Sequence, residues 1–434
     1  MPMSAAFNRR LTDVLPEVVR HFGTPFHLYD EQGLHETAEA FDRAFSALRY
    51  REFFAVKALP NPAVLRLLYD HRFGFDCSSP PELSLAARAG AEAGDIMFTS
   101  NNTSRAELAA AVELGATVNI DDEAVLDKLA DLPRLPDSLC LRVNPGRLAS
   151  STTPEGRGHP FLGTPETAKF GIRTDRLPAV CAKARRMGIE RFGLHMMLAS
   201  NSLTAQPLLS TLDLLLEQVL RLRESLGLEV ELLNLGGGIG IPYRPQQQTF
   251  DIEALGAAIA ARLRDWRREH GGDIPLICFE SGRYLTGPHG VLATRVVNRM
   301  SKWRECAGVD ASMSALMRPA LYPDAYHHIT VPWPRPGPPE TVDVTGSLCE
   351  NNDKFGVDRE LPPLAEGDLL LIHDTGAHGH SMGFTYNGRL RPQELLLRTD
   401  GGVELIRRAE NEQDHFATLR FHPVVLPRPL EPVS

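Results

Sequence analysis

Eight short apolar runs, each closed by a polar or glycine-rich group, recur along the first two thirds of the chain. They cover residues 53–58, 74–78, 96–100, 117–121, 139–145, 191–198, 232–238 and 276–282. The segments between them have mostly helical patterns, so strand and helix alternate through this whole part of the sequence. The repeat predicts a (β/α)8 barrel, in which active sites lie at the carboxyl ends of the strands.

The residues that close the runs should therefore meet at one mouth of the barrel. They are Lys57, Asp76, Asn101, Asp121, Asn144, His195, Gly236–Gly238 and Glu280. A lysine that faces a glycine-rich loop and a carboxylate suggests a cofactor held through a Schiff base. Glycine has no Cβ, so the backbone N–H groups of such a loop can surround a phosphate. A phosphate is therefore the expected ligand of the loop.

Each of these signals also has an ordinary structural explanation. Glycine-rich turns are common, a single histidine on a strand is usually buried and hydrogen-bonded, and Glu280 with Arg283 could form a structural ion pair. In combination, these residues could each have a role at a pyridine cofactor. Glu280 could keep a pyridine nitrogen protonated, His195 could stack on the ring, and Arg283 could bind a phosphate or a carboxylate.

The bulk composition limits the function classes. The net charge of -9 and a pI of about 5.9 argue against a nucleic-acid surface. The apolar stretches are too short for a membrane span, and the start lacks the apolar segment of a secretory signal. The six cysteines are scattered without a CxxC pair. We therefore expect a cytoplasmic enzyme with free thiols and no metal site, nucleic-acid partner or membrane contact.

The pattern changes after residue 285. Strand-like runs follow at 290–298, 341–345, 368–373 and 394–398, and Asp400-Gly401-Gly402 predicts a hairpin. We expect a barrel domain over 30–285 and a mainly β domain over 286–434, with residues 1–29 partly joining the second. Within the barrel, capping boxes at Ser79 with Glu82 and at Ser104 with Glu107 mark helix starts.

Residues 146–168 interrupt the barrel repeat. This segment is rich in Gly, Pro, Ser and Thr and has no apolar period. A loop of this length at the strand-end face is often an active-site lid, and a plain surface insertion has the same composition. Both interpretations stay open from the sequence.

Taken together, the motifs resemble one family from about residue 24 to about residue 410. The chain is similar to the fold type III pyridoxal-phosphate decarboxylases, and most of all to the diaminopimelate decarboxylases. The segments that carry the resemblance are FFAVKA, FDCSSPPEL, FTSNN, LRVNPG, KFGI, GLH, NLGGGIGIPY, FESGR, LMRPALYPDAYHHI, CENND and DTGAHGHSMGFTYN. The resemblance implies a barrel with a β domain, pyridoxal 5'-phosphate as cofactor, and a homodimer with shared active sites.

The resemblance also implies a role for individual residues at the cofactor. Lys57 would form the Schiff base, His195 would stack on the pyridine and Glu280 would meet the ring nitrogen. The residues assigned to the cofactor are Lys57, Asp76, His195, Ser200, Gly237, Gly238, Glu280 and Tyr386. The two glycines and Tyr386 would hold the phosphate, with Ser200 a weaker candidate, and the role of Asp76 is left open.

On the substrate side, the resemblance implies that Arg283, Arg318 and Tyr322 bind a carboxylate. Cys349 and Glu350 would reach into the partner subunit's site. There Cys349 would return a proton to the α-carbon after CO2 leaves, and Glu350 would read a distal ammonium. A thiol suits this step because its ordinary pKa lies close to working pH.

The departures from the family pattern gather on the substrate side. The family has a second histidine and a glycine after the residue that matches His195, where this chain has 196–201 (MMLASN). Ser281 stands in place of a proline, His378 in place of a tyrosine, and Pro81 in place of a glycine. Successive strand residues face opposite ways, so one of the two methionines must point away from the cofactor.

These departures leave the substrate open. The main interpretation is decarboxylation of meso-diaminopimelate to L-lysine. Alternatives are a related carboxylate-rich amino acid in a siderophore or other secondary pathway, and an inactive homologue that binds partners. Retention of Lys57, Glu280 and Cys349 argues against the last. A racemase fits less well, because the Cys349-Glu350 motif and the resemblance along the chain are those of decarboxylases. A metal-dependent hydrolase fits less well still, because the run at His195 lacks paired histidine ligands.

Overall fold

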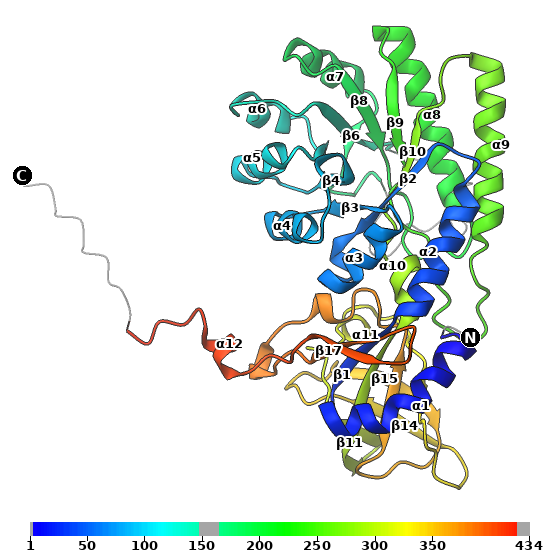
Figure 1. Ribbon diagram of the computed structural model, residues 1–434, viewed down its shortest axis with the longest axis vertical. Coiled ribbons are helices and arrows are strands. Elements are labelled where there is room, and N and C mark those ends of the chain that lie inside the picture. Colours follow the sequence, from blue (N-terminus) through cyan, green and yellow to red (C-terminus); the bar gives the residue numbers. More distant parts are fainter. Residues whose placement is uncertain (1–2, 147–164, 423–434) are drawn as a thin grey trace, which may run out of the picture.

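The computed structural model describes residues 3–146 and 165–422. Its first sheet is a barrel of parallel strands (Figure 1). The strands are β2 (Tyr50–Ala55), β3 (Gly74–Cys77), β4 (Ile96–Thr99), β5 (Thr117–Ile120), β6 (Ser138–Asn144), β8 (Arg191–His195), β9 (Val230–Asn234) and β10 (Leu276–Phe279). Pairing of β5 with β6 and of β2 with β10 closes the sheet, and the short β7 (Ile172–Arg173) extends beside β6. The predicted (β/α)8 barrel is confirmed.

Helices surround the barrel because each buries one apolar face against the outside of the strands. They are α2 (Glu31–Phe45), α3 (Pro62–Asp70), α4 (Pro80–Arg88), α5 (Arg105–Leu114), α6 (Val125–Ala130), α7 (Leu177–Arg186), α8 (Gln206–Leu226) and α9 (Ile252–His270). Inside the barrel, Phe53, Met97, Cys140 and Cys278 form a separate apolar cluster. The interior is therefore packed, and space for chemistry lies at the rim.

The two predicted capping boxes have different outcomes. At α5, Ser104 accepts from the Glu107 N–H and the Glu107 side chain accepts from the Ser104 N–H, as expected. At α4, the prediction is wrong, because the Ser79 side chain makes no capping hydrogen bond. The Glu82 carboxylate instead accepts from the Ser78 N–H at 2.7 Å. Proline at the first helical positions removes N–H groups that a serine cap could use.

The second sheet is mainly antiparallel. Its strands are β1 (Phe26–Asp30), β11 (Gly290–Ser301), β12 (Glu305–Val309), β13 (Ile329–Thr330), β14 (Glu340–Thr345), β15 (Lys354–Leu361), β16 (Leu369–His373), β17 (Gln393–Leu397) and β18 (Val403–Arg407). β1 lies between β11 and β17, and α1 (Ala5–Phe22) packs on this part of the sheet. β17 and β18 form the predicted hairpin. A barrel with a mainly β sheet is confirmed, while the boundaries 30–285 and 286–434 stay predictions.

The loop after β16 joins the second sheet to the barrel mouth. The His378 N–H donates to the Ala58 carbonyl at 2.9 Å, and the Ser381 hydroxyl donates to the same oxygen at 3.2 Å. Ala58 belongs to η1 (Val56–Ala58), the single turn that follows β2 and carries Lys57. The β part of the chain therefore holds the turn that presents the lysine.

The remaining elements are short. They are α10 (Arg283–Thr286), α11 (Arg318–Leu321), α12 (Glu412–Phe416) and the single turns η2 (Ala93–Asp95), η4 (Gly287–His289), η5 (His380–Met382) and η6 (Tyr386–Gly388). Figure 1 shows α12 on a segment that leads away from the body of the molecule. The lid or insertion predicted at 146–168 falls, for residues 147–164, outside the described residues.

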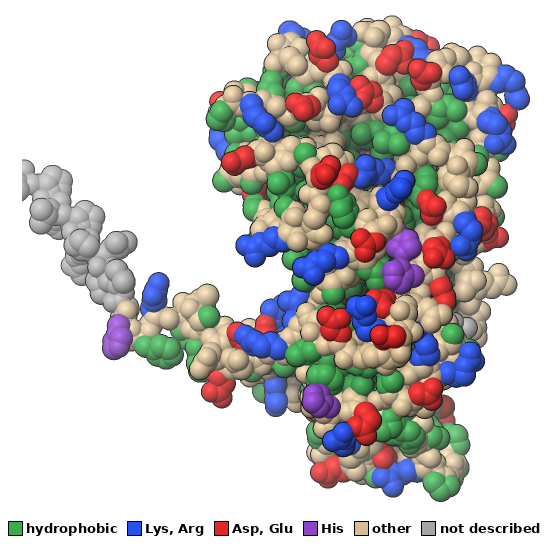
Figure 2. All heavy atoms as spheres, in the orientation of Figure 1, with side chains coloured by type: hydrophobic (Ala, Val, Ile, Leu, Met, Phe, Trp, Pro, Cys, Tyr) green, Lys and Arg blue, Asp and Glu red, His purple; other side chains and the backbone are tan. Residues whose placement is uncertain are grey.

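The surface in view is of mixed charge. Figure 2 shows acidic and basic side chains interspersed over this face. None of the described helices combines the length and the apolar character needed to cross a membrane. A cytoplasmic location stays a prediction.

Candidate active site

Lys57 lies at the carboxyl end of β2 and faces the neighbouring strand β3. Ala55 pairs with Asp76 in the barrel, so the lysine just beyond it comes over the aspartate, and the Nζ–Oδ2 distance is 3.0 Å. The Lys57 side chain is 51% exposed, whereas Asp76 is fully buried. Desolvation lowers the pKa of Lys57, but the carboxylates of Asp76 and Glu280 outweigh it and raise the pKa to about 12. Lys57 is therefore an ammonium ion beside carboxylates, open toward the mouth.

His195 ends β8 and is almost completely buried. Its Nδ1 accepts from the Asn119 side-chain amide at 2.9 Å, which leaves the ring proton on Nε2. Nε2 lies 3.5 Å from a carboxylate oxygen of Glu280. Burial lowers the pKa of His195 well below its ordinary value, and the charge of Arg142 lowers it further. The imidazole is thus neutral, in a fixed tautomer, at the centre of the mouth.

Glu280 follows β10 and is held from two other strands. Its Oε1 accepts from the Asn234 amide at 2.7 Å and from the Thr99 hydroxyl at 3.3 Å. Asn234 also accepts from the Gly236 N–H at 2.8 Å, so the same side chain fixes the carboxylate and the start of the glycine-rich loop.

Three residues that hydrogen-bond to Glu280 or His195 were not predicted from the sequence: Thr99, Asn119 and Asn234. Each stands at or next to the carboxyl end of a strand. That position is the signal that could have found them.

The glycine-rich loop requires glycine because other backbone comes very close to it. A Cβ on Gly237 would lie 2.5 Å from the Glu280 carbonyl oxygen, and one on Gly238 would lie 2.5 Å from that of Ala199. Gly236 has a φ of +66°, and a Cβ there would lie 3.1 Å from His195 Nε2. The loop therefore presents bare backbone beside the histidine and the glutamate, as phosphate binding needs.

Residues 196–201, which follow His195, contact the glycine-rich loop and the residues next to it. Met196 is 1% exposed in the main core, so one methionine of the pair does point away from the mouth. Met197 lies beside a small cavity with Arg142 and Phe170. Asn201 adopts a φ of +54°, and its side-chain oxygen accepts from the Ile241 N–H at 3.0 Å. The residues that depart from the family pattern, 196–201, thus pack beside the glycine-rich loop at the mouth.

A cavity of about 190 Å³ adjoins this run on the side of α10 and α11. Its lining includes Ser200, Arg283, Arg318 and Tyr322, four of the predicted site residues. Arg283 donates to the Tyr243 hydroxyl, and the Arg318 guanidinium lies 5.1 Å from the centre of the same ring. Burial lowers the pKa of Arg318, and the charge of Arg283 lowers it further. The cavity is therefore strongly cationic.

Three other predicted mouth residues fasten the chain next to the segment 147–164. The Asn144 amide donates to the carbonyls of Pro165 and Phe170, each at 2.8 Å. Asp121 accepts from the Gly171 N–H at 3.2 Å, and the side chain of Asn101 lies close enough to lower the pKa of this carboxyl. These contacts indicate a role in holding the backbone of 165–171 against the barrel.

Cys349, Glu350 and Tyr386 form a separate group on the β part of the chain. All three are exposed, and none of them lines the arginine cavity. The neighbouring Glu350 carboxylate raises the pKa of the Tyr386 hydroxyl, and the Cys349 N–H donates to Asn387 Oδ1 at 2.9 Å. Asp353 accepts from the Leu348 N–H at 2.8 Å and so fixes this loop. The predicted roles of these three residues stay predictions.

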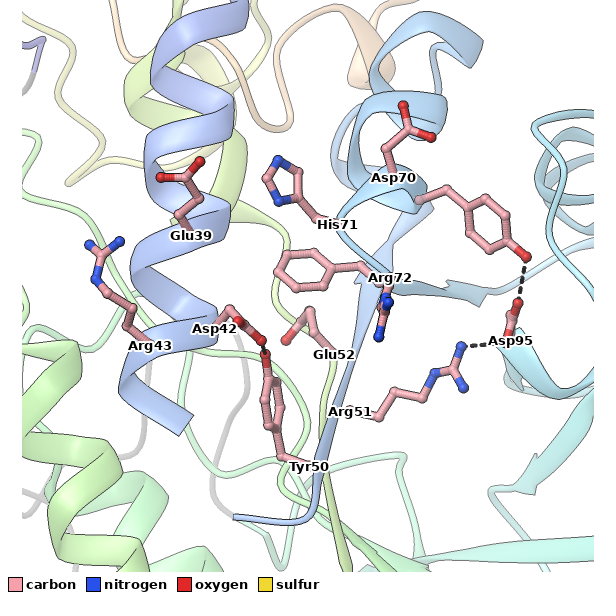
Figure 3. A pocket seen from close by; sticks show the side chains of 12 residues that line it. Glu39, Asp42, Arg43, Tyr50, Arg51, Glu52, Asp70, His71, Arg72 and Asp95 are labelled. Carbon is pink, nitrogen blue, oxygen red and sulfur yellow. Dashed lines mark hydrogen bonds and ion pairs between the residues drawn. The ribbon is translucent and has the colours of Figure 1, made fainter. Parts of the chain in front are cut away.

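A larger cavity, of about 960 Å³, lies on the outer side of the barrel between α2 and α3 (Figure 3). Figure 3 shows Tyr50 directed at Asp42 and Arg51 directed at Asp95, and the first hydrogen bond measures 2.7 Å. None of the predicted site residues lines this groove. Among the described residues that line it there is no lysine and no glycine-rich loop, so we place the active site at the mouth instead.

The mouth fits pyridoxal phosphate on three independent features. Lys57 supplies an amine, the glycine loop supplies bare backbone, and two buried polar atoms there lack hydrogen-bond partners in the described residues. These atoms are His195 Nε2 and Asp76 Oδ1. A cofactor with a phosphate and a pyridine nitrogen matches such a set of donors and acceptors.

Comparison with known proteins agrees with this assignment. Residues 31–287 match the family model described as "Pyridoxal-dependent decarboxylase, pyridoxal binding domain". The protein TabA of Pseudomonas amygdali pv. tabaci is 47% identical over 425 residues, covering 98% of both chains. A diaminopimelate decarboxylase of Methanothermobacter thermautotrophicus is 36% identical over 401 residues, covering 92% of both.

Solved structures show the same likeness. The diaminopimelate decarboxylase from M. jannaschii in complex with L-lysine is 30% identical with a TM-score of 0.83, over 92% of this chain and 93% of that one. The Helicobacter pylori enzyme complexed with L-lysine is 27% identical with a TM-score of 0.83, over 93% and 98%. The chain belongs to the pyridoxal-dependent decarboxylases, enzymes that act on amino acids with pyridoxal 5'-phosphate as cofactor.

Proposed function

We propose that this decarboxylase acts on an α-amino acid whose distal end carries a carboxylate and an ammonium. The simplest such substrate is meso-diaminopimelate, with L-lysine as product. The observation that carries the proposal is the gathering of Arg283, Arg318 and Tyr322 around one cavity beside the mouth. Guanidinium groups bind carboxylates through paired, charge-assisted hydrogen bonds. The relatives named diaminopimelate decarboxylase support the same substrate.

The residues at the mouth would divide the work. Pyridoxal phosphate, when bound, supplies a ring that draws electrons from the α-carbon as CO2 leaves. Lys57 would hold the cofactor covalently, Glu280 would face the ring nitrogen and His195 would lie against the ring. Hydrogen bonds from other strands already hold Glu280 and His195, so both side chains are preorganised. Gly237 and Gly238 would bind the phosphate through backbone N–H groups.

The partner subunit would complete the site in a homodimer. Cys349 and Glu350 are exposed on this chain and lie outside the arginine cavity, so a second copy is the natural source of these groups. Cys349 would then protonate the α-carbon, and Glu350 would bind the distal ammonium. A strictly monomeric preparation with full activity, identified by light scattering at assay concentration, would contradict this part of the proposal.

The direct experiment incubates the chain with pyridoxal phosphate and meso-diaminopimelate and measures CO2 and lysine. We expect equal amounts of both products, and a large loss of both with Lys57→Ala. Absorbance of the bound cofactor in the near-visible range gives a second readout. Binding of the cofactor without any CO2 from meso-diaminopimelate would reject this substrate and leave the family assignment intact.

A second candidate substrate is a related, more carboxylate-rich amino acid of a secondary pathway. The observation that favours it is His378, which replaces the family's tyrosine. Burial lowers the pKa of His378 well below its ordinary value, and the charges of Arg283, Arg318 and Lys57 lower it further. This neutral imidazole therefore stands among the cations of the substrate side. Release of CO2 from such an amino acid, with little from meso-diaminopimelate, would select this candidate.

A further inference from the structure

The cavity beside the mouth holds more positive charge than one carboxylate needs. Besides Arg283 and Arg318, its lining includes Arg244, which follows the glycine-rich loop. None of the three guanidinium groups forms an ion pair with a carboxylate of residues 3–146 or 165–422. Asp324 also lines the cavity, and it offers one negative charge against three positive ones. An unbalanced cluster of this kind favours bound anions.

Arg244 belongs to a stack that is separate from the Arg283–Arg318 pair. Its guanidinium lies 4.5 Å from the centre of the Tyr326 ring, and that of Arg359 lies 3.8 Å from the same centre. Burial lowers the pKa of Arg359, and the charge of Arg244 lowers it further. The buried Nε of Arg359 has no partner in the described residues. Two like charges held this close by one ring are stabilised when an anion joins them.

The two arginine groups share one cavity but different aromatic rings. Arg283 and Arg318 lie against Tyr243, whereas Arg244 lies against Tyr326. The volume of about 190 Å³ equals that of roughly six water molecules, at about 30 Å³ each. It is enough for two carboxylates and the carbons between them.

We propose that Arg244 and Tyr326 form a second anion-binding subsite beside Arg283 and Arg318. The substrate class is then that of the second candidate, an amino acid that carries a further anionic group besides one distal carboxylate. The inference rests on the proposed function for the location of the distal end. It goes further in naming Arg244 as the residue that selects for the second anion.

The test compares two small probes by calorimetry on the full chain loaded with pyridoxal phosphate. Glutarate carries two carboxylates and butyrate carries one on a chain of similar size. We expect glutarate to bind at least about tenfold more tightly than butyrate, the gain of about one hydrogen-bonded ion pair. Equal affinities, or no measurable glutarate binding, would overturn the proposal.

Variants locate the effect. Arg244→Gln should bring glutarate down to the affinity of butyrate, and Arg244→Lys should keep part of the gain, because it keeps the charge without the planar fork. Arg318→Gln should weaken both probes, since it removes the first subsite. Arg264 is exposed on α9, and Arg264→Gln is the matched control that should change neither. Unchanged glutarate affinity in Arg244→Gln would also overturn the proposal.

The probe measurement is independent of the decarboxylase assay. A preference for glutarate that depends on Arg244, without CO2 release from meso-diaminopimelate, would keep the subsite and reject that substrate. CO2 release without the preference would keep the proposed function and reject the subsite.

Discussion

The mouth of this barrel has two sides that balance charge in opposite ways. On the lysine side, Lys57 has Asp76 at 3.0 Å, and Glu280 and His195 each accept hydrogen bonds from other strands. On the arginine side, Arg318 and Arg244 lie against tyrosine rings, with no carboxylate partner in the described residues. Partners within the chain hold most of the lysine side and leave His195 Nε2 and Asp76 Oδ1 for the cofactor, whereas the arginines lack carboxylate partners in the described residues and are available to the substrate. Chemistry and substrate choice can therefore change separately.

The strongest test of the lysine side is Lys57→Ala. Without the amine the cofactor loses its covalent attachment, and we expect CO2 release to fall by roughly a thousandfold or more. The near-visible absorbance of the loaded protein should be lost as well. Lys302, exposed beyond β11, gives the control Lys302→Ala, which should keep both. Activity within tenfold of the starting protein would show that another residue holds the cofactor.

The sequence predicted the lysine side well because its main residues close apolar runs. Lys57, His195 and Glu280 stand where a strand ends, and the barrel brings strand ends together. The sequence could not predict the arginine side as fully. Arg244 comes near Tyr326 and Arg359 only through folding, across sequence separations of about 80 and 115 residues, and no local period marks such contacts.

Acid should act on the arginine side through His327. This buried imidazole donates from Nδ1 to the His373 carbonyl at 2.7 Å, and burial, with Arg318 next, lowers its pKa to about 3. The unfolded chain takes up the proton from about pH 6.5 downward, whereas the folded chain resists until about pH 3. The contribution of His327 is thus complete above pH 6.5 and falls by about 3 kcal/mol at pH 4.

Denaturant unfolding at several pH values measures this effect. His327→Gln keeps a donor and cannot titrate, so its free energy of unfolding should fall less between pH 6.5 and 4. His21→Gln changes an exposed histidine and should follow the starting protein. Parallel pH curves for the starting protein and His327→Gln would show that protonation of His327 does not contribute to acid sensitivity.

Arg318→Gln separates the two sides by substrate. We expect kcat/KM for meso-diaminopimelate to fall by about 10- to 100-fold, the value of a charge-assisted pair. The absorbance of the bound cofactor should stay the same, because Lys57 and its partners are untouched. Any slow reaction with L-lysine, which lacks the distal carboxylate, should change little. An equal loss on both amino acids would mean that Arg318 supports the lysine side too.

The smallest effect is expected at Ser281, which lies between the two sides. Its N–H donates to the buried Glu52 carboxyl at 2.6 Å, a bond that the family's proline at this position cannot make. Burial raises the pKa of Glu52, and this bond opposes the rise. Ser281→Pro should therefore lower the free energy of unfolding by about 1–3 kcal/mol, since it leaves a buried acceptor unpaired. Ser281→Ala keeps the N–H and should cost much less.

A double-mutant cycle decides whether Glu52 is the reason. In a Glu52→Leu background the same proline should cost little, because no buried carboxyl is left to satisfy. If the proline costs as much without Glu52, backbone strain at Ser281 explains the loss. A loss confined to stability, with kcat for the substrate unchanged, would show that this departure from the family pattern is a local exchange of hydrogen bonds. A changed kcat would instead couple the segment between Glu280 and Arg283 to both sides of the mouth, and the comparison between them would no longer hold.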